Sequence, residues 1–180
     1  VQTKATGRQE PFMSATARSA ARPAATPAAT TATVGTDADP LVIDPGRAFG
    51  TGTHESTRLC LRALGSLAGR RDLGRAIDIG TGTGILAVAA ARLGACPVVA
   101  SDTDPDALAS ARVHAGLNRV SLQLVQADGP GPFRPGQADL VLANITAPLL
   151  ASHAEGLAGL RTPGGVLVLS GILEEDLSTV

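Results

Sequence analysis

At 180 residues the chain is long enough for about one domain, and its 15 basic and 16 acidic residues argue against a nucleic-acid surface held by bulk charge. Aromatic residues make up 2% of the chain, too few for stacking platforms on single-stranded nucleic acid. Two cysteines are too few for a disulfide framework or a metal site with four cysteine ligands, so we expect reduced thiols, no metal site and a cytoplasmic protein. No apolar run reaches the roughly 20 residues that are needed to span a bilayer.

The first 36 residues differ in composition from the rest of the chain. They are rich in Ala, Thr and Pro and lack apolar periodicity, so we expect residues 1–36 to be a disordered leader. The segment has four basic side chains and one acidic side chain, Glu10, which is the charge balance of an organelle transit peptide. A flexible leader, or non-coding sequence translated in error, would have the same composition. The chain begins with Val and its one Met is Met13, so the true start is left open.

From residue 41 onward, strand and helix patterns alternate. Apolar runs predict strands at residues 41–43, 75–79, 97–101, 120–127, 138–145 and 165–170. Helices are predicted at residues 55–67, 84–93, 148–160 and from 172 on, and another begins at Asp104-Pro105, with Asp as the N-cap. One face of the first helix is expected to carry Leu59, Leu61, Leu64 and Leu67. The alternation indicates an α/β fold with a doubly wound parallel sheet.

In such a sheet ligands bind at the carboxyl ends of the strands. The turn after the strand at residues 75–79 carries Gly80, Gly82 and Gly84. The dinucleotide fingerprint G-x-G-x-x-G would need glycine where Ile85 stands. A G-x-G-x-G turn preceded by Asp78 is the form usual in S-adenosylmethionine enzymes. Asp78 either binds the methionine amine of that cofactor, directly or through water, or only ties the turn together.

Acidic residues follow the next two strands. Asp102 ends its strand 22 residues after Gly80, where a carboxylate accepts hydrogen bonds from both ribose hydroxyls of an adenosine cofactor. Asp104 is expected to be a helix cap. Asp128 either binds the adenine amino group or is a solvated loop residue.

Asn144 ends the predicted strand at residues 138–145, where its polar amide needs hydrogen-bond partners. In amino-group methyltransferases this position holds the acceptor nitrogen through the Asn side-chain oxygen and a neighbouring backbone carbonyl. The alternative is an Asn that only caps the next helix. We expect Asn144 to be the catalytic residue.

The run Asp44-Pro45-Gly46-Arg47-Ala48-Phe49-Gly50-Thr51-Gly52-Thr53-His54 ends 26 residues ahead of Gly80. Glycine-rich backbone is costly to order, so we expect this run to lie over a bound cofactor. Together with Thr57, residues 80–86 and Ala143-Asn144-Ile145, it resembles the ribosomal protein L-eleven methyltransferase family (PrmA).

The resemblance implies a class I methyltransferase core with a Rossmann-like fold over residues 37–180. It implies transfer of a methyl group from S-adenosylmethionine to lysine or N-terminal amino groups of a large-subunit ribosomal protein, without direct contact to nucleic acid or membrane. The family's cofactor contacts fall on Thr57, Gly80, Asp102 and Asn144.

The chain departs from the family in three places. Glu55 stands where the family has Pro, residues 1–36 cannot form the family's N-terminal recognition domain, and the chain ends before the final strands of this fold. Two other functions therefore stay open: a truncated or non-catalytic cofactor-binding fragment, and a nicotinamide-dependent oxidoreductase. His54 is expected either to handle a proton or to organise its loop, while His114 and His153 are expected to be surface or packing residues.

Overall fold

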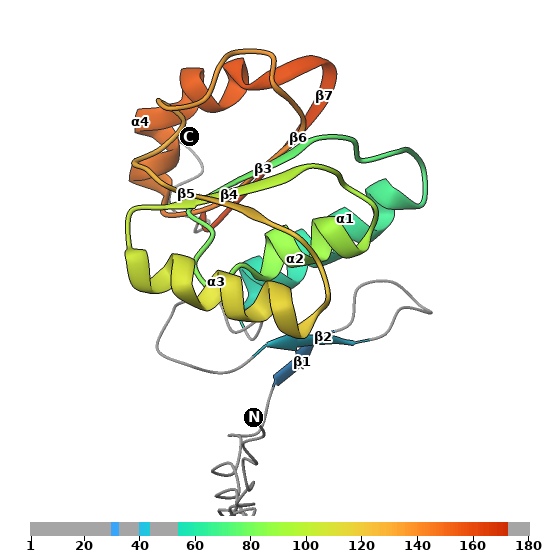
Figure 1. Ribbon diagram of the computed structural model, residues 1–180. Coiled ribbons are helices and arrows are strands. Elements are labelled where there is room, and N and C mark those ends of the chain that lie inside the picture. The colour runs from blue at the N-terminus through green and yellow to red at the C-terminus, as the bar shows by residue number, and fades with distance from the viewer. Residues whose placement is uncertain (1–29, 33–39, 44–53, 173–180) are drawn as a thin grey trace, which may run out of the picture.

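The computed structural model describes residues 30–32, 40–43 and 54–172 (Figure 1). Most of the predicted leader, the run from Asp44 to Thr53 and the helix predicted beyond Ile172 lie outside the described residues. The elements in chain order are β1 (Thr30–Ala32), β2 (Leu41–Ile43), α1 (Glu55–Ala68), β3 (Ala76–Ile79), α2 (Ile85–Arg92), β4 (Val98–Asp102), α3 (Pro105–Leu117), β5 (Gln123–Gln126), β6 (Ala138–Asn144), α4 (Ala147–Gly159) and β7 (Arg161–Ser170).

Five of these strands form one parallel sheet in the order β5-β4-β3-β6-β7. Helices α1, α2 and α3 cover one face of the sheet, and α4 covers the other (Figure 1). Strand order reverses at β3, because β4 and β5 lie on one side of it and β6 and β7 on the other. The predicted doubly wound α/β fold is confirmed.

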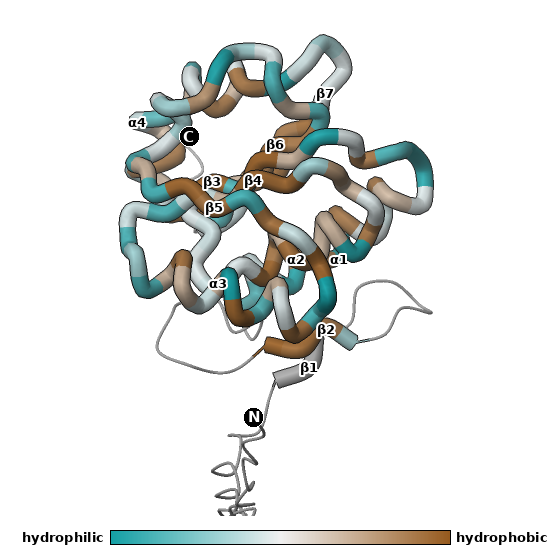
Figure 2. The backbone as a smooth tube through the Cα atoms, in the orientation of Figure 1, coloured by the Kyte–Doolittle hydropathy of each residue, from teal (hydrophilic) through white to brown (hydrophobic). Residues whose placement is uncertain are grey.

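Each face of the sheet has its own hydrophobic core, since alternate side chains of a strand point to opposite faces. In β3, Ala76 packs toward α1 and α2, whereas Ile77 and Ile79 pack toward α4 with Leu150 and Leu157. Figure 2 shows the hydrophobic residues gathered in the central strands and in α2. The same alternation directs Asp78 of β3, and Asn144 at the end of β6, to the α1 side.

The element bounds differ from prediction mainly at the sheet edges. Edge strand β5 is shorter than the predicted 120–127, and β7 begins at Arg161 because Ala138 pairs with that residue ahead of a register shift. Leu61 and Leu64 of α1 are buried, but Leu59 does not share their face and is 52% exposed. The step of two residues from Leu59 to Leu61 corresponds to a rotation of about 200° around the helix axis.

A short strand lies within the range predicted as the leader. Thr30–Ala32 forms β1 and pairs antiparallel with β2. Strand β2 is fixed to α3 by Asn118, whose side chain accepts from Val42 N at 2.9 Å and donates to Val42 O at 2.8 Å. A buried amide thus supplies the partners that a neighbouring strand would offer.

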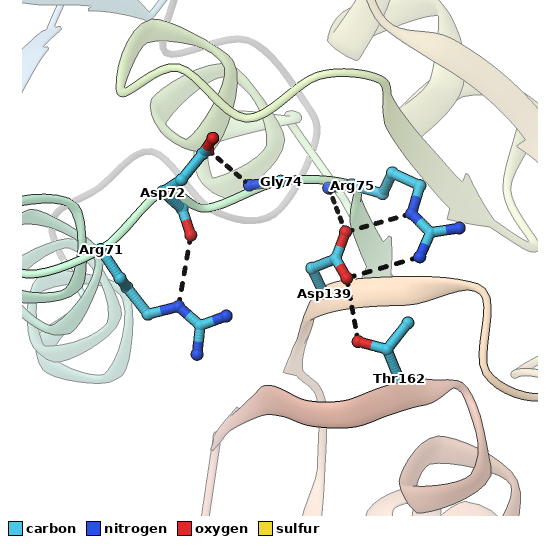
Figure 3. Close-up of polar contacts among 6 residues, drawn as sticks. All are labelled: Arg71, Asp72, Gly74, Arg75, Asp139 and Thr162. Carbon is cyan, nitrogen blue, oxygen red and sulfur yellow. Dashed lines mark hydrogen bonds and ion pairs between the residues drawn. The ribbon is translucent and has the colours of Figure 1, made fainter.

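A polar cluster joins the amino ends of the strands, at the edge of the sheet opposite to the turns discussed below (Figure 3). Asp139 accepts hydrogen bonds from the backbone N–H of Arg75 at 2.9 Å, from its side chain at 3.1 Å, and from the Thr162 hydroxyl at 2.9 Å. These donors, Arg75 first among them, hold the pKa of Asp139 well below its usual range. The cluster ties β3, β6 and β7 together where the strands begin.

Candidate active site

The carboxyl ends of β3, β4, β5, β6 and β7 contribute to a single cavity of about 800 Å³. This volume is within the range of about 300–1,000 Å³ that is common for small-molecule sites. The predicted site residues that line it are Thr57, Asp78, Gly80, Gly82, Asp102, Asp128 and Asn144. Residues from turns that are far apart in the sequence therefore meet at one site.

The glycine turn after β3 owes its shape to left-handed backbone. Gly80, Gly82 and Gly84 have φ angles of 70°, 54° and 81°, which other residues adopt only at a cost. The backbone N–H groups of Gly80 and Thr81 both donate to Ser101 O at 2.9 Å, so the turn is held against the end of β4. A Cβ on Gly80 would collide with the Ile145 side chain, which lies directly beside the turn.

Asp78 ties this turn together, as one of the two sequence interpretations expected. Its side chain accepts a hydrogen bond from the Thr81 hydroxyl at 2.7 Å and another from the backbone N–H of Ala87 in the first turn of α2. Asp78 is 1% exposed, and this burial raises its pKa to about 7. The carboxyl group is therefore poised between its charged and neutral forms near neutral pH.

Asp102 is fixed by two backbone hydrogen bonds at the end of β4. Its Oδ2 accepts from Gly82 N at 2.8 Å, and its Oδ1 accepts from Asp104 N at 3.1 Å. Each carboxylate oxygen can accept a second hydrogen bond, so the pair remains able to receive two neighbouring hydroxyl groups. Asp104 is the N-cap of α3 and accepts from Asp106 N at 2.8 Å, which confirms the expected cap.

Asn144 ends β6 with its side chain turned toward α1. Its Nδ2 donates to the Thr57 hydroxyl at 3.2 Å, and Thr57 is fully buried in the first turn of α1. This bond fixes the direction of the amide. Within the part of the chain that the structure describes, Asn144 Oδ1 accepts no hydrogen bond, so it is available to an N–H donor in the cavity.

Asp128 follows β5 and lies beside His153 of α4. The distance between His153 Nε2 and Asp128 Oδ1 is 3.7 Å, and both residues line the cavity. The expectation for His153 was a surface or packing role, and its position in the cavity wall was not foreseen. His114 is a packing residue as expected, because it is 1% exposed and its Nδ1 lies 2.6 Å from Thr83 O.

Gly84 was predicted to contact the cofactor, but it is not among the residues that line the cavity. It is the N-cap of α2, and a Cβ there would lie 2.7 Å from the Ala111 Cβ of α3. The third glycine of the motif therefore serves helix packing. Ile145, which belongs to the family run Ala143-Asn144-Ile145, and Leu149 also line the cavity. Sequence reasoning missed Ser170, which lines the cavity without a motif signal of its own.

The charge of the lining is one-sided. Among the described residues that line the cavity are the carboxylates of Glu55, Asp78, Asp102 and Asp128, and there is no lysine or arginine. Such a lining favours a cationic ligand and opposes a pyrophosphate, which carries two negative charges. His54 lies at the rim as the N-cap residue of α1.

A sequence model of the ribosomal protein L11 methyltransferase family (PrmA) matches residues 17–180. The chain belongs to this family. Ribosomal protein L11 methyltransferase of Geobacter metallireducens is 51% identical over 138 residues, which cover 77% of this chain and 44% of the relative. The Pseudomonas aeruginosa enzyme is 47% identical over 146 residues, covering 80% and 48%. The chain thus spans less than half the length of these relatives.

One solved structure agrees with this membership, and a second shares the fold. The crystal structure of ribosomal protein L11 methylase from Lactobacillus delbrueckii subsp. bulgaricus matches with a TM-score of 0.69 at 34% identity, over 76% of this chain and 68% of that one. A methyltransferase from Geobacter sulfurreducens, solved with S-adenosyl-L-homocysteine, matches with a TM-score of 0.53 at 24% identity, over 66% and 51%. The fold is that of class I methyltransferases, and the oxidoreductase alternative is set aside.

Proposed function

We propose that this PrmA-family chain binds S-adenosylmethionine in the cavity and carries the catalytic residues of a protein N-methyltransferase. The observation that supports this most is the acidic lining, with four carboxylates and no lysine or arginine among the described lining residues. S-adenosylmethionine carries a sulfonium and an ammonium cation, and both are favoured by such a lining.

The residues present fit this cofactor. The two oxygens of Asp102 are held by Gly82 N and Asp104 N, in the arrangement that suits a ribose with two hydroxyl groups. Asp128, at the end of β5, would receive the adenine amino group, and Asp78 would receive the methionine amine through water, because its carboxyl group is 1% exposed. When bound, the cofactor supplies an electrophilic methyl group.

The acceptor must be a neutral amine, since a protonated one has no lone pair. A lysine with a pKa of about 10.4 is neutral in only about one molecule in 2,500 at pH 7, a deficit of roughly 4.6 kcal/mol. Apolar side chains at the cavity mouth, Leu59 and Leu149, would lower that pKa by excluding water. Asn144 Oδ1 would accept an N–H of the amine and so direct its lone pair toward the methyl group.

The proposed substrate is a lysine side chain or the N-terminal amine of ribosomal protein L11. This proposal follows the name of the family and of the relatives, whose full length the chain does not span. The reaction would then take place in the cytoplasm. No helix in the described part of the chain is long and apolar enough to cross a bilayer.

The test is methyl transfer from S-adenosylmethionine to purified ribosomal protein L11, followed by mass spectrometry of the product. We expect methylated lysine or N-terminal amine with the unaltered chain. Asn144→Ala should lower turnover by on the order of 100-fold, because the amine loses its orientation, and should weaken cofactor binding much less.

Thr57→Val is the matched variant for Asn144, because it removes the hydroxyl that holds the amide and keeps the side-chain shape. Its turnover should fall between that of the unaltered chain and that of Asn144→Ala. Cofactor binding without methylation would instead mean that the chain is a non-catalytic fragment. Should cofactor affinity collapse in Asn144→Ala while turnover per bound cofactor holds, Asn144 is a cofactor ligand.

A further inference from the structure

His153 occupies the wall of the cavity between the Asn144 turn and the Asp128 turn. It lies on α4, and its side chain is 24% exposed, whereas that of Asp128 is 81% exposed. A carboxylate as exposed as this one has several rotamers open to it. Within the described part of the chain, the imidazole nitrogen of His153, 3.7 Å from Asp128 Oδ1, is the charged-group partner of this carboxylate.

The imidazole also takes the place of a side chain at Gly129. A Cβ on Gly129 would lie 2.6 Å from His153 Cε1, 2.7 Å from Nε2 and 2.8 Å from Nδ1, so the ring rests directly on the glycine. Gly129 has a φ of 59°, which shapes the turn that follows Asp128. His153 therefore contacts both the backbone and the carboxylate of this turn.

One helix turn further along α4, Gly156 faces the residue that comes next in the same loop. A Cβ on Gly156 would lie 2.5 Å from Pro130 Cγ. Residues three apart share a helix face, so His153 and Gly156 together hold α4 against residues 129–130. Because α4 begins directly after the Asn144 turn, this contact connects the acceptor side of the cavity with the Asp128 side.

We propose that His153 is a positioning residue for adenine recognition. It holds the Gly129 turn and directs the Asp128 carboxylate toward the 6-amino group of the bound purine. This inference rests on the proposed function, in which the adenine of the cofactor lies at Asp128. In this proposal His153 acts on the purine through Asp128.

The test is calorimetric titration of the full 180-residue chain with two ligands. One is S-adenosylhomocysteine, and the other is the analogue whose purine lacks the 6-amino group. His153→Leu keeps an apolar side chain against Gly129 but removes the ring nitrogens. His153→Gln restores an N–H donor. Glu155→Gln, at an exposed position on the same helix, is the control.

We expect His153→Leu to bind S-adenosylhomocysteine about threefold to fivefold more weakly, the scale of one partly exposed polar contact. Binding of the analogue should not change, because that ligand offers Asp128 no amino group. His153→Gln should recover most of the loss, and Glu155→Gln should bind both ligands normally.

Equal weakening for both ligands would show that His153 only supports the fold, and no weakening would show that it does not act on Asp128. Either result overturns the inference while leaving the proposed cofactor in place. Failure of the unaltered chain to bind either ligand overturns the proposed function and the inference together.

Discussion

Asp78 lies in β3 with its carboxyl group enclosed by Thr81 and the start of α2, and burial raises its pKa to about 7. The ordinary value is 3.8, so between about pH 4 and pH 7 the folded state binds more protons than the unfolded state. Stability must then fall as pH rises through this window and level off above it.

We therefore expect the free energy of unfolding to decrease by roughly 2.5 kcal/mol from about pH 5 to pH 7.5. Asp78→Asn removes the ionisable group, so its profile over the same range should be flatter. Urea denaturation of both proteins at a series of pH values measures this difference. Parallel profiles would mean that the buried carboxyl group does not titrate in this window.

Some residues of the cavity lining could be predicted from the sequence, and others depend on tertiary contacts. Asp102 and Asn144 can be recognised in the sequence because they are polar residues at the ends of apolar strands, and both line the cavity. His153 has no such signal, because its contact with Gly129 exists only once α4 lies over the sheet. Gly84 was assigned to the cofactor because the motif does not distinguish a ligand contact from a helix contact.

Among the elements, the start of α2 contacts α3 at Gly84, the N-cap of α2. An alanine there would bring its Cβ to 2.7 Å from Ala111 Cβ, at a φ of 81°. Gly94 is the matched control, since it has a φ of 97° and nothing within 4 Å of a Cβ. Both Gly→Ala variants incur the backbone cost of a left-handed residue, about 1–2 kcal/mol, but only Gly84→Ala also forces the helices apart.

Gly84→Ala should therefore lower the free energy of unfolding by about 1–3 kcal/mol more than Gly94→Ala does. Urea denaturation of the two variants checks this value. Equal losses would show that α3 moves away from α2 without cost.

The strands are joined at their amino ends by Asp139 (Figure 3). Asp139→Asn puts an N–H group opposite either the Arg75 backbone donor or the Thr162 hydroxyl, so it should cost about 1–3 kcal/mol of stability. Asp72→Asn is the control, because exposed Asp72 accepts from Gly74 N at 2.9 Å and does not bridge strands. A loss no larger than that of Asp72→Asn would contradict a role in strand pairing.

The lowered pKa of Asp139 gives this cluster a pH dependence opposite to that of Asp78. Its contribution is present above the ordinary pKa of a carboxyl group and is lost as pH falls through the folded-state value. The two effects on stability occur in different pH ranges. The loss of stability from Asp139 begins below about pH 4, whereas the loss of stability from Asp78 occurs above about pH 4.

At the scale of the whole molecule, the sequence predicts the order of strands and helices and the edge of the sheet where ligands bind. Apolar runs and glycine turns are local signals, so they can be identified in the sequence without knowledge of tertiary contacts. The pairing of Thr30–Ala32 with β2 was missed because three residues of small and β-branched side chains carry no periodicity. The early start of β7 likewise depends on its partner β6.

The central claim is that the cavity at the carboxyl edge of the sheet binds S-adenosylmethionine. Calorimetric titration of the 180-residue chain tests it most directly, with NAD as the competing ligand and Asp102→Ala as the site variant. We predict binding of S-adenosylmethionine, no measurable binding of NAD, and a loss of about 1.5–3 kcal/mol of binding free energy in Asp102→Ala. Absence of S-adenosylmethionine binding, or unchanged affinity in a folded Asp102→Ala variant, would contradict the account.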